Sequence, residues 1–259
     1  MRSEPEPAFG TAEHEERYRI LMEVVADRKT SRAFAPCEIP RRHYEMILDA
    51  ARHGPSGANS QPWHFIVVED PEIKARITEL LVSEQRSRAD LRMKFPTPNY
   101  RFVATAPGFV MVATDFRLVR AFPVLRDPAV AAESPDKAAM YRANAERILL
   151  QSVAAATMSA HLAAAALGYG VWWITAIGQE AIQSEIKPLL GVPDELALVD
   201  IMLFGPPLKP PYKRWKRSLE EIVNWGRFDP AHQMSDEDIE AWIRDKRHKV
   251  MYRDESNVD

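Results

Sequence analysis

Five consecutive residues near the N-terminus combine three cations with two hydroxyls: Arg28, Lys29, Thr30, Ser31 and Arg32. A phosphate monoester offers two charges and three acceptor oxygens, and guanidinium and hydroxyl groups are the donors that bind it. Basic residues at the end of a helix can also compensate the helix dipole without binding a ligand. The residues alone therefore leave two interpretations open, a phosphate site and a charged helix end.

Residues 54–65 have the composition of a loop that approaches a planar ligand. They read Gly-Pro-Ser-Gly-Ala-Asn-Ser-Gln-Pro-Trp-His-Phe. Glycine permits close backbone approach, and the amides of Asn59 and Gln61 can match the donor and acceptor edge of a heterocycle. A plain connection between a helix and a strand needs few of these features. We therefore interpret this segment as a candidate binding loop.

A second basic group, Lys-Arg-Trp-Lys-Arg, occupies residues 213–217. Ser218 and Glu221 follow it with capping-box spacing and predict a short helix, whose free N–H groups could face an anion. The group is short and the chain has a formal net charge of −3, which does not favour a nucleic-acid surface. A solvated run of charges is the alternative.

The sequence lacks the motifs of several common active sites. It has no glycine-rich dinucleotide fingerprint, Walker A loop, HExxH zinc motif or GxSxG elbow. The single cysteine, Cys37, allows no intramolecular disulfide, and the histidines lack metal-ligand spacing. Neither a signal peptide nor an apolar span of about 20 residues is evident. We therefore expect a cytoplasmic protein with no metal, no nucleic-acid partner and no membrane partner.

Hydrophobic periodicity predicts the elements that position these residues. Helices are expected over 13–29, 40–53, 70–82, 136–167 and 179–190, and strands over 64–69, 109–114, 171–174 and 196–204. The first of these strands is expected to be buried. In the middle of the 136–167 helix, residues 154–166, small side chains lie almost all round, so we expect this helix to be buried too, with a subunit interface as one possible place for it.

The remaining segments complete the predicted organisation. Residues 1–12 are expected to form a flexible arm, 13–228 one domain, and 229–259 a helical extension that starts at a Ser235–Asp238 capping box. Residues 83–106 mix arginines with Pro96 and Pro98 and predict a long irregular segment. Such a segment is either a lid or a solvated surface excursion.

Taken in order, these segments resemble the FMN-dependent nitroreductase superfamily, nearest its iodotyrosine deiodinase-like branch. Residues 28–34, RKTSRAF, resemble its R-R-S-x-R-x-F phosphate motif, with Lys and Thr as the departures. Residues 55–65, PSGANSQPWHF, resemble its P-S-x-x-N-S-Q-P-W-x-F flavin loop. Thr105-Ala106-Pro107, the alanine-rich helix before Gly168 and residues 216–222 follow in the family's order. The match runs from about Tyr18 to Trp225.

The resemblance implies an α+β fold in which helices flank a central, mixed and mostly antiparallel sheet. It also implies an obligate homodimer that binds FMN at each subunit interface. The implied contacts of the phosphate and ribityl chain are Arg28, Lys29, Thr30 and Arg32, with Lys216 or Arg217 closing from the far end of the domain. The implied contacts of the flavin ring, partly from the other subunit, are Pro55, Ser56, Gly57, Asn59, Gln61, Trp173, Ile174 and Thr175. Thr175 would supply the hydroxyl at flavin N5.

The resemblance also implies the reaction, in which electrons pass from NADH or NADPH through FMN to a small aromatic acceptor of the nitroaromatic or quinone type. The alternatives are reductive dehalogenation of halophenols, favoured by Thr175, and flavin binding without catalysis. The lid opposes a halotyrosine substrate, because arginines follow Glu84 and the next tyrosine comes late. The candidate lid residues are Glu84, Arg88, Arg92 and Tyr100. Five basic residues in the lid favour an anionic acceptor.

Overall fold

The computed structural model describes residues 10–90, 100–210 and 216–247 of the 259-residue chain. Of these, residues 10–81 and 101–210 form one compact unit, while residues 82–90, 100 and 216–247 belong to a second. The first unit contains the sheet and every predicted cofactor-binding residue except Lys216 and Arg217.

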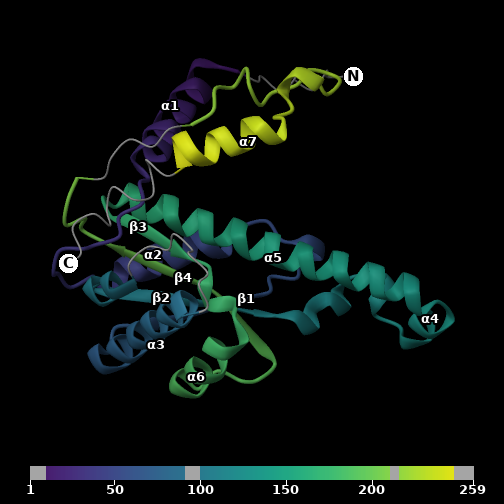
Figure 1. Ribbon diagram of the computed structural model, residues 1–259, viewed down its shortest axis with the longest axis horizontal. Helices are drawn as coiled ribbons and strands as arrows, with labels where there is room; N and C mark the ends of the chain where they lie inside the picture. The colour runs from purple at the N-terminus through teal and green to yellow at the C-terminus, as the bar shows by residue number, and fades with distance from the viewer. Residues whose placement is uncertain (1–9, 91–99, 211–215, 248–259) are drawn as a thin grey trace, which may run out of the picture. The chain divides into compact units, whose positions relative to one another are not determined.

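Four strands form the sheet of the first unit, in the order β1-β2-β4-β3 with every neighbouring pair antiparallel (Figure 1). Their bounds are Trp63–Val68 (β1), Gly108–Asp115 (β2), Gly170–Ile174 (β3) and Leu196–Gly205 (β4). The inner strands β2 and β4 are mostly buried. The prediction of a buried first strand is wrong in part, because β1 lies at an edge of the sheet and exposes His64 and Val67.

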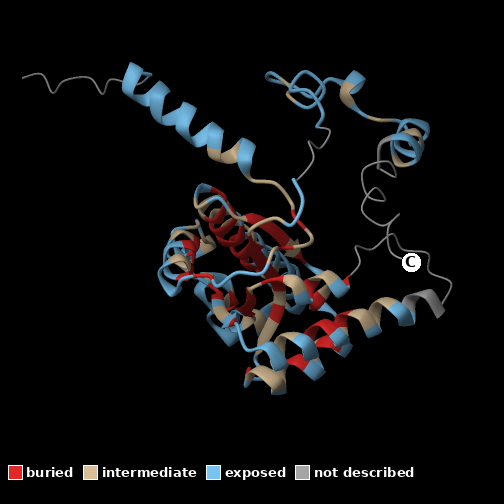
Figure 2. Ribbon diagram, turned by 90° about the vertical axis from the view of Figure 1, so that its left-hand side faces the viewer, coloured by how far each residue is buried: buried red, intermediate tan, exposed pale blue. Residues whose placement is uncertain are grey.

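Two helices close the core over one face of this sheet. Helix α2 (Arg41–Arg52) and helix α5 (Pro135–Ala166) share a buried cluster with residues of β2, β3 and β4. The contact from α2 comes from Tyr44, Ile47 and Ala51, which recur at helical spacing as the sequence predicts. Figure 2 shows the buried residues gathered in the strands and in the elements packed on them.

Small residues set the distance between α2 and α5. A Cβ atom at Gly54, just after α2, would lie 2.9 Å from both the N and the Cα of Ala156. Ala156, Ala160 and Ala164 repeat every four residues on α5, and each is at most 1% exposed. Small side chains let packed helices and sheets approach closely. The predicted burial of α5 is therefore confirmed for this face, whereas its opposite face exposes apolar residues such as Met140 and Leu150.

The other helices of the described residues are α1 (Ala12–Asp27), α3 (Pro71–Asp90), α4 (Pro128–Glu133), α6 (Glu180–Leu190) and α7 (Asp236–Trp242). Side-chain caps fix several of their starts. Thr11 and Ser235 both form capping boxes, which confirms the predicted start of the C-terminal helix. Gly191 ends α6 in the left-handed conformation. The last helical turn, Ile243–Arg247, has π geometry.

The prediction that residues 83–106 are irregular is wrong at both ends. Helix α3 continues to Asp90, and a 3-10 turn spans Tyr100–Thr105. Residues 84–90, Glu-Gln-Arg-Ser-Arg-Ala-Asp, contain several good helix formers and no proline, so nothing local stops the helix at Val82. The two prolines that suggested an irregular segment lie at 96 and 98, outside the described residues.

The short helix predicted after Ser218 is also absent from the described residues. The reciprocal bonds of a capping box form, since Ser218 N donates to Glu221 Oε2 (2.6 Å) and Glu221 N donates to Ser218 Oγ (3.3 Å). The backbone that follows makes only turns. Ile222 and Val223 are weak helix formers, and Gly226 adopts a φ of 77° that a right-handed helix does not allow.

Helix α5 is long and apolar enough to span a membrane, judged by length and composition alone. Half of its apolar window is buried inside the protein, and core helices of globular proteins meet the same criterion. Among the residues that the structure describes, no other helix meets it.

Candidate functional site

The basic segment of residues 28–32 runs along the start of the edge strand β3. Thr30 forms a parallel bridge with Val171. Ser31 N donates to Val171 O (2.9 Å), and Val171 N donates to Lys29 O (3.2 Å). Ser31 is only 6% exposed, and successive side chains of an extended segment point to opposite sides. Thr30 therefore points to the side opposite the buried Ser31, whereas Arg32 follows at a bend and has a buried Nε.

Backbone contacts hold the continuation of this segment equally firmly. Phe34 is 2% exposed, and its N–H donates to Thr105 Oγ1 (3.1 Å). Ala35 N donates to Pro206 O (2.8 Å), beyond the end of β4. Gly170 makes room for the segment, because a Cβ at that position would lie 2.5 Å from Ser31 Oγ. The segment is therefore fixed through its backbone and its inward side chains.

His161 of α5, which is not among the predicted site residues, connects two residues that are. It is 3% exposed, and its ring stands edge-on to Trp173 with centroids 5.6 Å apart. Burial, and secondly the charge of Arg28, lower the pKa of His161 to about 4, so the ring is neutral at pH 7. Its Nε2 has no hydrogen-bond partner. Arg28 and Trp173 thus lie around one neutral side chain.

A signal for His161 was present in the sequence. Residues 153–166 of the alanine-rich stretch contain only one ionisable side chain, this histidine. Its importance depends on Arg28 and Trp173, which come from distant parts of the chain. Periodicity along the helix could not indicate those neighbours.

The candidate binding loop before β1 holds an unusual backbone. Ala58, Asn59 and Gln61 have φ values of 53°, 49° and 44°, in the region that favours glycine. Each such residue costs about 1 kcal/mol or more, and this kind of strain is concentrated at binding sites. Gln61 N donates to Ser56 Oγ (3.1 Å), and Gln61 Nε2 donates to Asn59 Oδ1 (3.2 Å). Asn59 and Gln61 are both exposed, so the loop presents their amides at the surface.

Helix α5 contacts both the loop and the basic segment, but at different points. Gly57 N donates to Ser152 Oγ (3.1 Å), whereas His161 lies beside Arg28 and Trp173. Nine helical residues separate the two points by about 13 Å. The loop precedes β1 and the basic segment adjoins β3, so they lie at opposite edges of the sheet, about 14 Å apart. One chain alone therefore does not bring these two groups together.

The far end of β3 borders a cavity of about 440 Å³. Trp173 and Thr175 line it, together with Asp200 of β4. Ile174 is 3% exposed and is not among the lining residues. The basic segment adjoins β3 near its first residues, at Val171, and Thr175 follows its last residue. The basic segment and the cavity therefore lie at opposite ends of β3.

Comparison with known proteins shows the family to which this chain belongs. Residues 25–206 match the model of the Nitroreductase family. The chain belongs to the nitroreductase family. A protein of Archaeoglobus fulgidus named "Putative NADH dehydrogenase/NAD(P)H nitroreductase" is 27% identical over 186 residues, which are 72% of this chain and 84% of that protein.

Two further proteins are similar to this member of the nitroreductase family. An iodotyrosine deiodinase of Haliscomenobacter hydrossis is 42% identical over 66 residues, which are 26% of this chain and 30% of that protein. The solved structure of an FMN-dependent nitroreductase from Clostridium difficile has a TM-score of 0.57 at 17% identity. That match covers 80% of this chain and 99% of the other and shows a shared fold. The predicted α+β fold with helices flanking a central sheet is thus confirmed, although the four described strands pair only antiparallel where a mixed sheet was predicted.

The predicted lid residues of this nitroreductase-family chain belong to the second compact unit. Glu84 lies on α3, and Tyr100 is 6% exposed, with its N–H 3.4 Å from Gln85 Oε1. The side chain of Arg88 and all of Arg92 lie outside the described residues. A shared role for these four residues in substrate binding stays a prediction.

The basic residues near the C-terminus also belong to the second unit. Lys216 and Arg217 are exposed, and Arg217 Nη2 donates to Glu221 O (2.7 Å). Their predicted contact with the phosphate stays a prediction, as does the wrapping of a partner subunit by the exposed Trp242 of α7.

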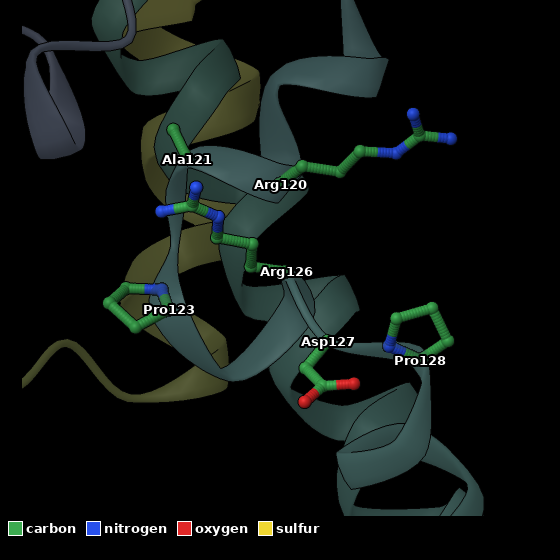
Figure 3. A pocket seen from close by; sticks show the side chains of 6 residues that line it. All are labelled: Arg120, Ala121, Pro123, Arg126, Asp127 and Pro128. Carbon is green, nitrogen blue, oxygen red and sulfur yellow. The ribbon is translucent and has the colours of Figure 1, made fainter.

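A larger cavity, of about 700 Å³, lies elsewhere in the first unit. It is lined by Arg120, Ala121, Pro123, Arg126, Asp127 and Pro128, none of which the sequence analysis singled out. Figure 3 shows the guanidinium groups of Arg120 and Arg126 pointing in different directions, so they do not converge on one ligand. Within the described part of the chain, no three His, Cys, Asp or Glu side chains gather into a metal-binding group.

Proposed function

We propose that this member of the nitroreductase family is an FMN-dependent oxidoreductase that passes electrons from NADH or NADPH to a small aromatic acceptor of the nitroaromatic or quinone type. The observation that carries the proposal is the backbone-fixed basic segment at one end of β3 with Thr175 just past the other end. The FMN-dependent nitroreductase of the same fold supports the choice of flavin.

The donor groups of the basic segment fit a phosphate monoester. Backbone bonds to β3 hold the segment in place. Lys29 Nζ lies 3.9 Å from the Asp27 carboxylate, and both groups are well exposed, so this weak pair would yield to a phosphate. His161 is neutral beside Arg28, so it adds no positive charge that would repel the guanidinium. Arg28, Lys29, Thr30 and Arg32 would therefore hold the phosphate and the ribityl chain.

FMN, when bound, supplies the electron-transfer chemistry, and the chain supplies position and electrostatics. Asn59 and Gln61 would address the polar edge of the flavin ring with their exposed amides. Pro55, Ser56 and Gly57 would line the ring. Thr175 would donate its hydroxyl at flavin N5. None of these residues acts as a nucleophile, in agreement with the lack of a nucleophile motif in the sequence.

The separation of the loop from the basic segment supports a site built by two copies of the chain. Within one chain these groups lie at opposite edges of the sheet. In a twofold dimer the loop of one subunit can lie beside the basic segment of its partner. The symmetry then forms the same site a second time. We therefore infer a homodimer with two equivalent flavin sites. Light scattering of the purified chain should give twice the mass of the monomer.

The first test is an absorption spectrum of the purified full chain, with chromatography of the cofactor that heat releases. We expect flavin bands and close to one FMN per chain. Arg32→Ala should lower the FMN content, whereas Arg120→Ala should leave it unchanged, because Arg120 is an exposed arginine away from the basic segment. A protein that stays colourless after reconstitution with FMN would refute the proposal.

Subunit complementation tests whether two chains build one site. Arg32→Ala and Asn59→Ala should each lower the FMN content strongly when expressed alone. When the two variants are co-expressed, random pairing makes about half of the dimers heterodimers. Each heterodimer has one intact site and one site with both alterations, so about a quarter of all sites regain FMN. No recovery, despite heterodimers detected by tags, would show that one chain supplies both residues to each site.

Reductive dehalogenation of halophenols is the second candidate function. It is favoured by the local 42% identity with an iodotyrosine deiodinase and by Thr175 at the cavity. Halide release from a halophenol and reduction of a nitroaromatic should be compared for wild type and Thr175→Ala. Halide release that depends on Thr175 would favour the dehalogenase, and nitro reduction alone would favour the first proposal. Bound FMN that neither NADH nor NADPH reduces would indicate flavin binding without catalysis.

A further inference from the structure

The cavity at the end of β3 has the size and lining of a site for a small organic molecule. Its volume of about 440 Å³ falls within the usual range for such sites. Most of its lining is apolar, and the one ionisable side chain among the lining residues is Asp200. The lining residues are Phe116, Leu150, Val153, Ala154, Trp173, Thr175, Gly178, Gln183, Ala197, Leu198, Val199 and Asp200.

An irregularity in the sheet places Asp200 at this cavity. Val112 of β2 pairs with Asp200 and Ala113 pairs with Leu198, so Val199 is an extra residue in β4. Such β-bulges re-aim side chains and often occur beside functional sites. The bulge therefore accounts for a carboxylate in the wall of an otherwise apolar cavity.

Asp200 is buried without a cationic partner. It is 6% exposed, and in the described part of the chain no lysine, arginine or histidine forms an ion pair with it. Thr157 Oγ1 donates to Asp200 Oδ2 at a long 3.4 Å, and Trp173 Nε1 forms no regular hydrogen bond. Burial raises the pKa of Asp200, and the nearby Trp173 and Thr157 offset part of the rise. A buried carboxylate of this kind is stabilised most by a cation that brings its own charge.

We propose that this cavity binds a small organic amine, whose ammonium group pairs with Asp200 and whose apolar body packs against Phe116, Leu150 and Trp173. An anionic ligand would meet a like charge and no cation. A neutral ligand of the same shape would gain the apolar contacts but would leave the carboxylate unpaired.

One chain contributes every lining residue of this cavity, and two of them, Trp173 and Thr175, are also predicted flavin contacts. The amine site therefore bears on the acceptor. The basic side chains in the segment 83–106 favour an anionic acceptor, whereas Asp200 favours a cationic ligand in the cavity beside Thr175.

Calorimetry with three matched probes tests the proposal on the purified full chain at pH 7.5. The probes are 2-phenylethylamine, 2-phenylethanol and phenylacetate, which are cationic, neutral and anionic. We expect the amine to bind at least about tenfold more tightly than the alcohol, and phenylacetate not to bind. Equal binding of amine and alcohol, or no binding of the amine, would overturn the proposal.

Three variants locate the binding. Asp200→Asn should reduce amine affinity to that of the alcohol and leave the alcohol unchanged, because Asn keeps the shape without the charge. Glu185→Gln removes one exposed negative charge from α6 outside the cavity and should change neither affinity. Ala154→Leu fills the cavity and should weaken both probes. Amine binding that survives both Asp200→Asn and Ala154→Leu would place the amine elsewhere and refute the proposal.

The same titrations separate this inference from the proposed function. They are carried out on the protein with FMN and on the protein freed of FMN. Amine binding that depends on Asp200 in a protein without flavin would support the cavity site while the flavin proposal failed. Bound FMN without a preference for the amine over the alcohol would support the proposed function and refute the amine site.

Discussion

The buried His161 makes the stability of this fold depend on pH in a way that one substitution can isolate. The pKa of His161 falls to about 4 in the folded protein, chiefly by burial and secondly by the charge of Arg28. An unfolded histidine titrates at about 6.5. Because the folded pKa is the lower one, the neutral ring stabilises the fold above pH 6.5. This contribution is lost as the pH falls from 6.5 toward 4.

The magnitude follows from the two pKa values. A difference of about 2.5 units corresponds to about 3 kcal/mol when the loss is complete, below pH 4. At pH 5 the unfolded histidine is almost fully protonated and the folded one only slightly, so the loss relative to pH 7.5 is about 2 kcal/mol. His161→Gln keeps a polar side chain of similar reach and removes the titration. We expect wild type to lose about 2 kcal/mol more than this variant between pH 7.5 and pH 5.

Urea unfolding at both pH values, followed by tryptophan fluorescence, measures this difference. Both proteins are compared in the same cofactor state, and every other titrating group cancels in the difference between them. His53→Gln, which removes an exposed histidine, is the control and should behave as wild type. If wild type and His161→Gln lost the same stability to within about 0.5 kcal/mol, the assignment of a neutral buried histidine would be wrong.

Three further predictions concern the scaffold around the candidate site. Gly54→Ala drives a methyl group into the backbone of α5 and should lower the free energy of unfolding by about 1–3 kcal/mol, whereas Gly178→Ala, with open space around it, should change it little. Thr105→Val removes the acceptor of a hydrogen bond that anchors the basic segment and should cost about 1 kcal/mol in urea unfolding. Arg117 is the main cause of the lowered pKa of Asp115, so Arg117→Leu should raise that pKa, which NMR titration of the carboxyl group would show.

Elements with regular patterns were predictable from the sequence. The strands at 109–114, 171–174 and 196–204 match β2, β3 and β4 to within a residue or two at each end. Continuous apolar runs bounded by Gly and Pro gave these positions, and apolar spacing along 40–53 gave the buried face of α2. Apolar runs and helical periodicity thus recovered the layers of the fold.

The errors arose where a local signal was taken as a boundary. Prolines at 96 and 98 suggested an irregular segment beginning at residue 83, although α3 runs to Asp90. A capping box at Ser218 suggested a helix, although the cap bonds form around a turn. A cap satisfies backbone donors wherever the chain bends suitably, and only the residues after it decide whether a helix propagates.

The geometry of the candidate site depends on contacts between distant residues, which no periodicity encodes. The motif at 28–34 was visible in the sequence, but its bridge to β3 and its bond to Thr105 were not. The bulge at Val199 was also invisible, because an extra residue in a long apolar run leaves the pattern unchanged. Asp200 therefore looked like an ordinary interruption of a strand.

The buried face of α5 explains how two opposite charges coexist beside β3. Thr157 and His161 are four residues apart, so they lie on the same face of the helix. Thr157 donates to Asp200 from this face, and His161 stands edge-on to Trp173 and lies near enough to Arg28 for the charge of Arg28 to lower its pKa. Because His161 is neutral, it does not cancel the negative charge of Asp200 or add to the positive charge of Arg28. Under the two proposals, a phosphate would bind at the Arg28 end and a cation at the Asp200 end.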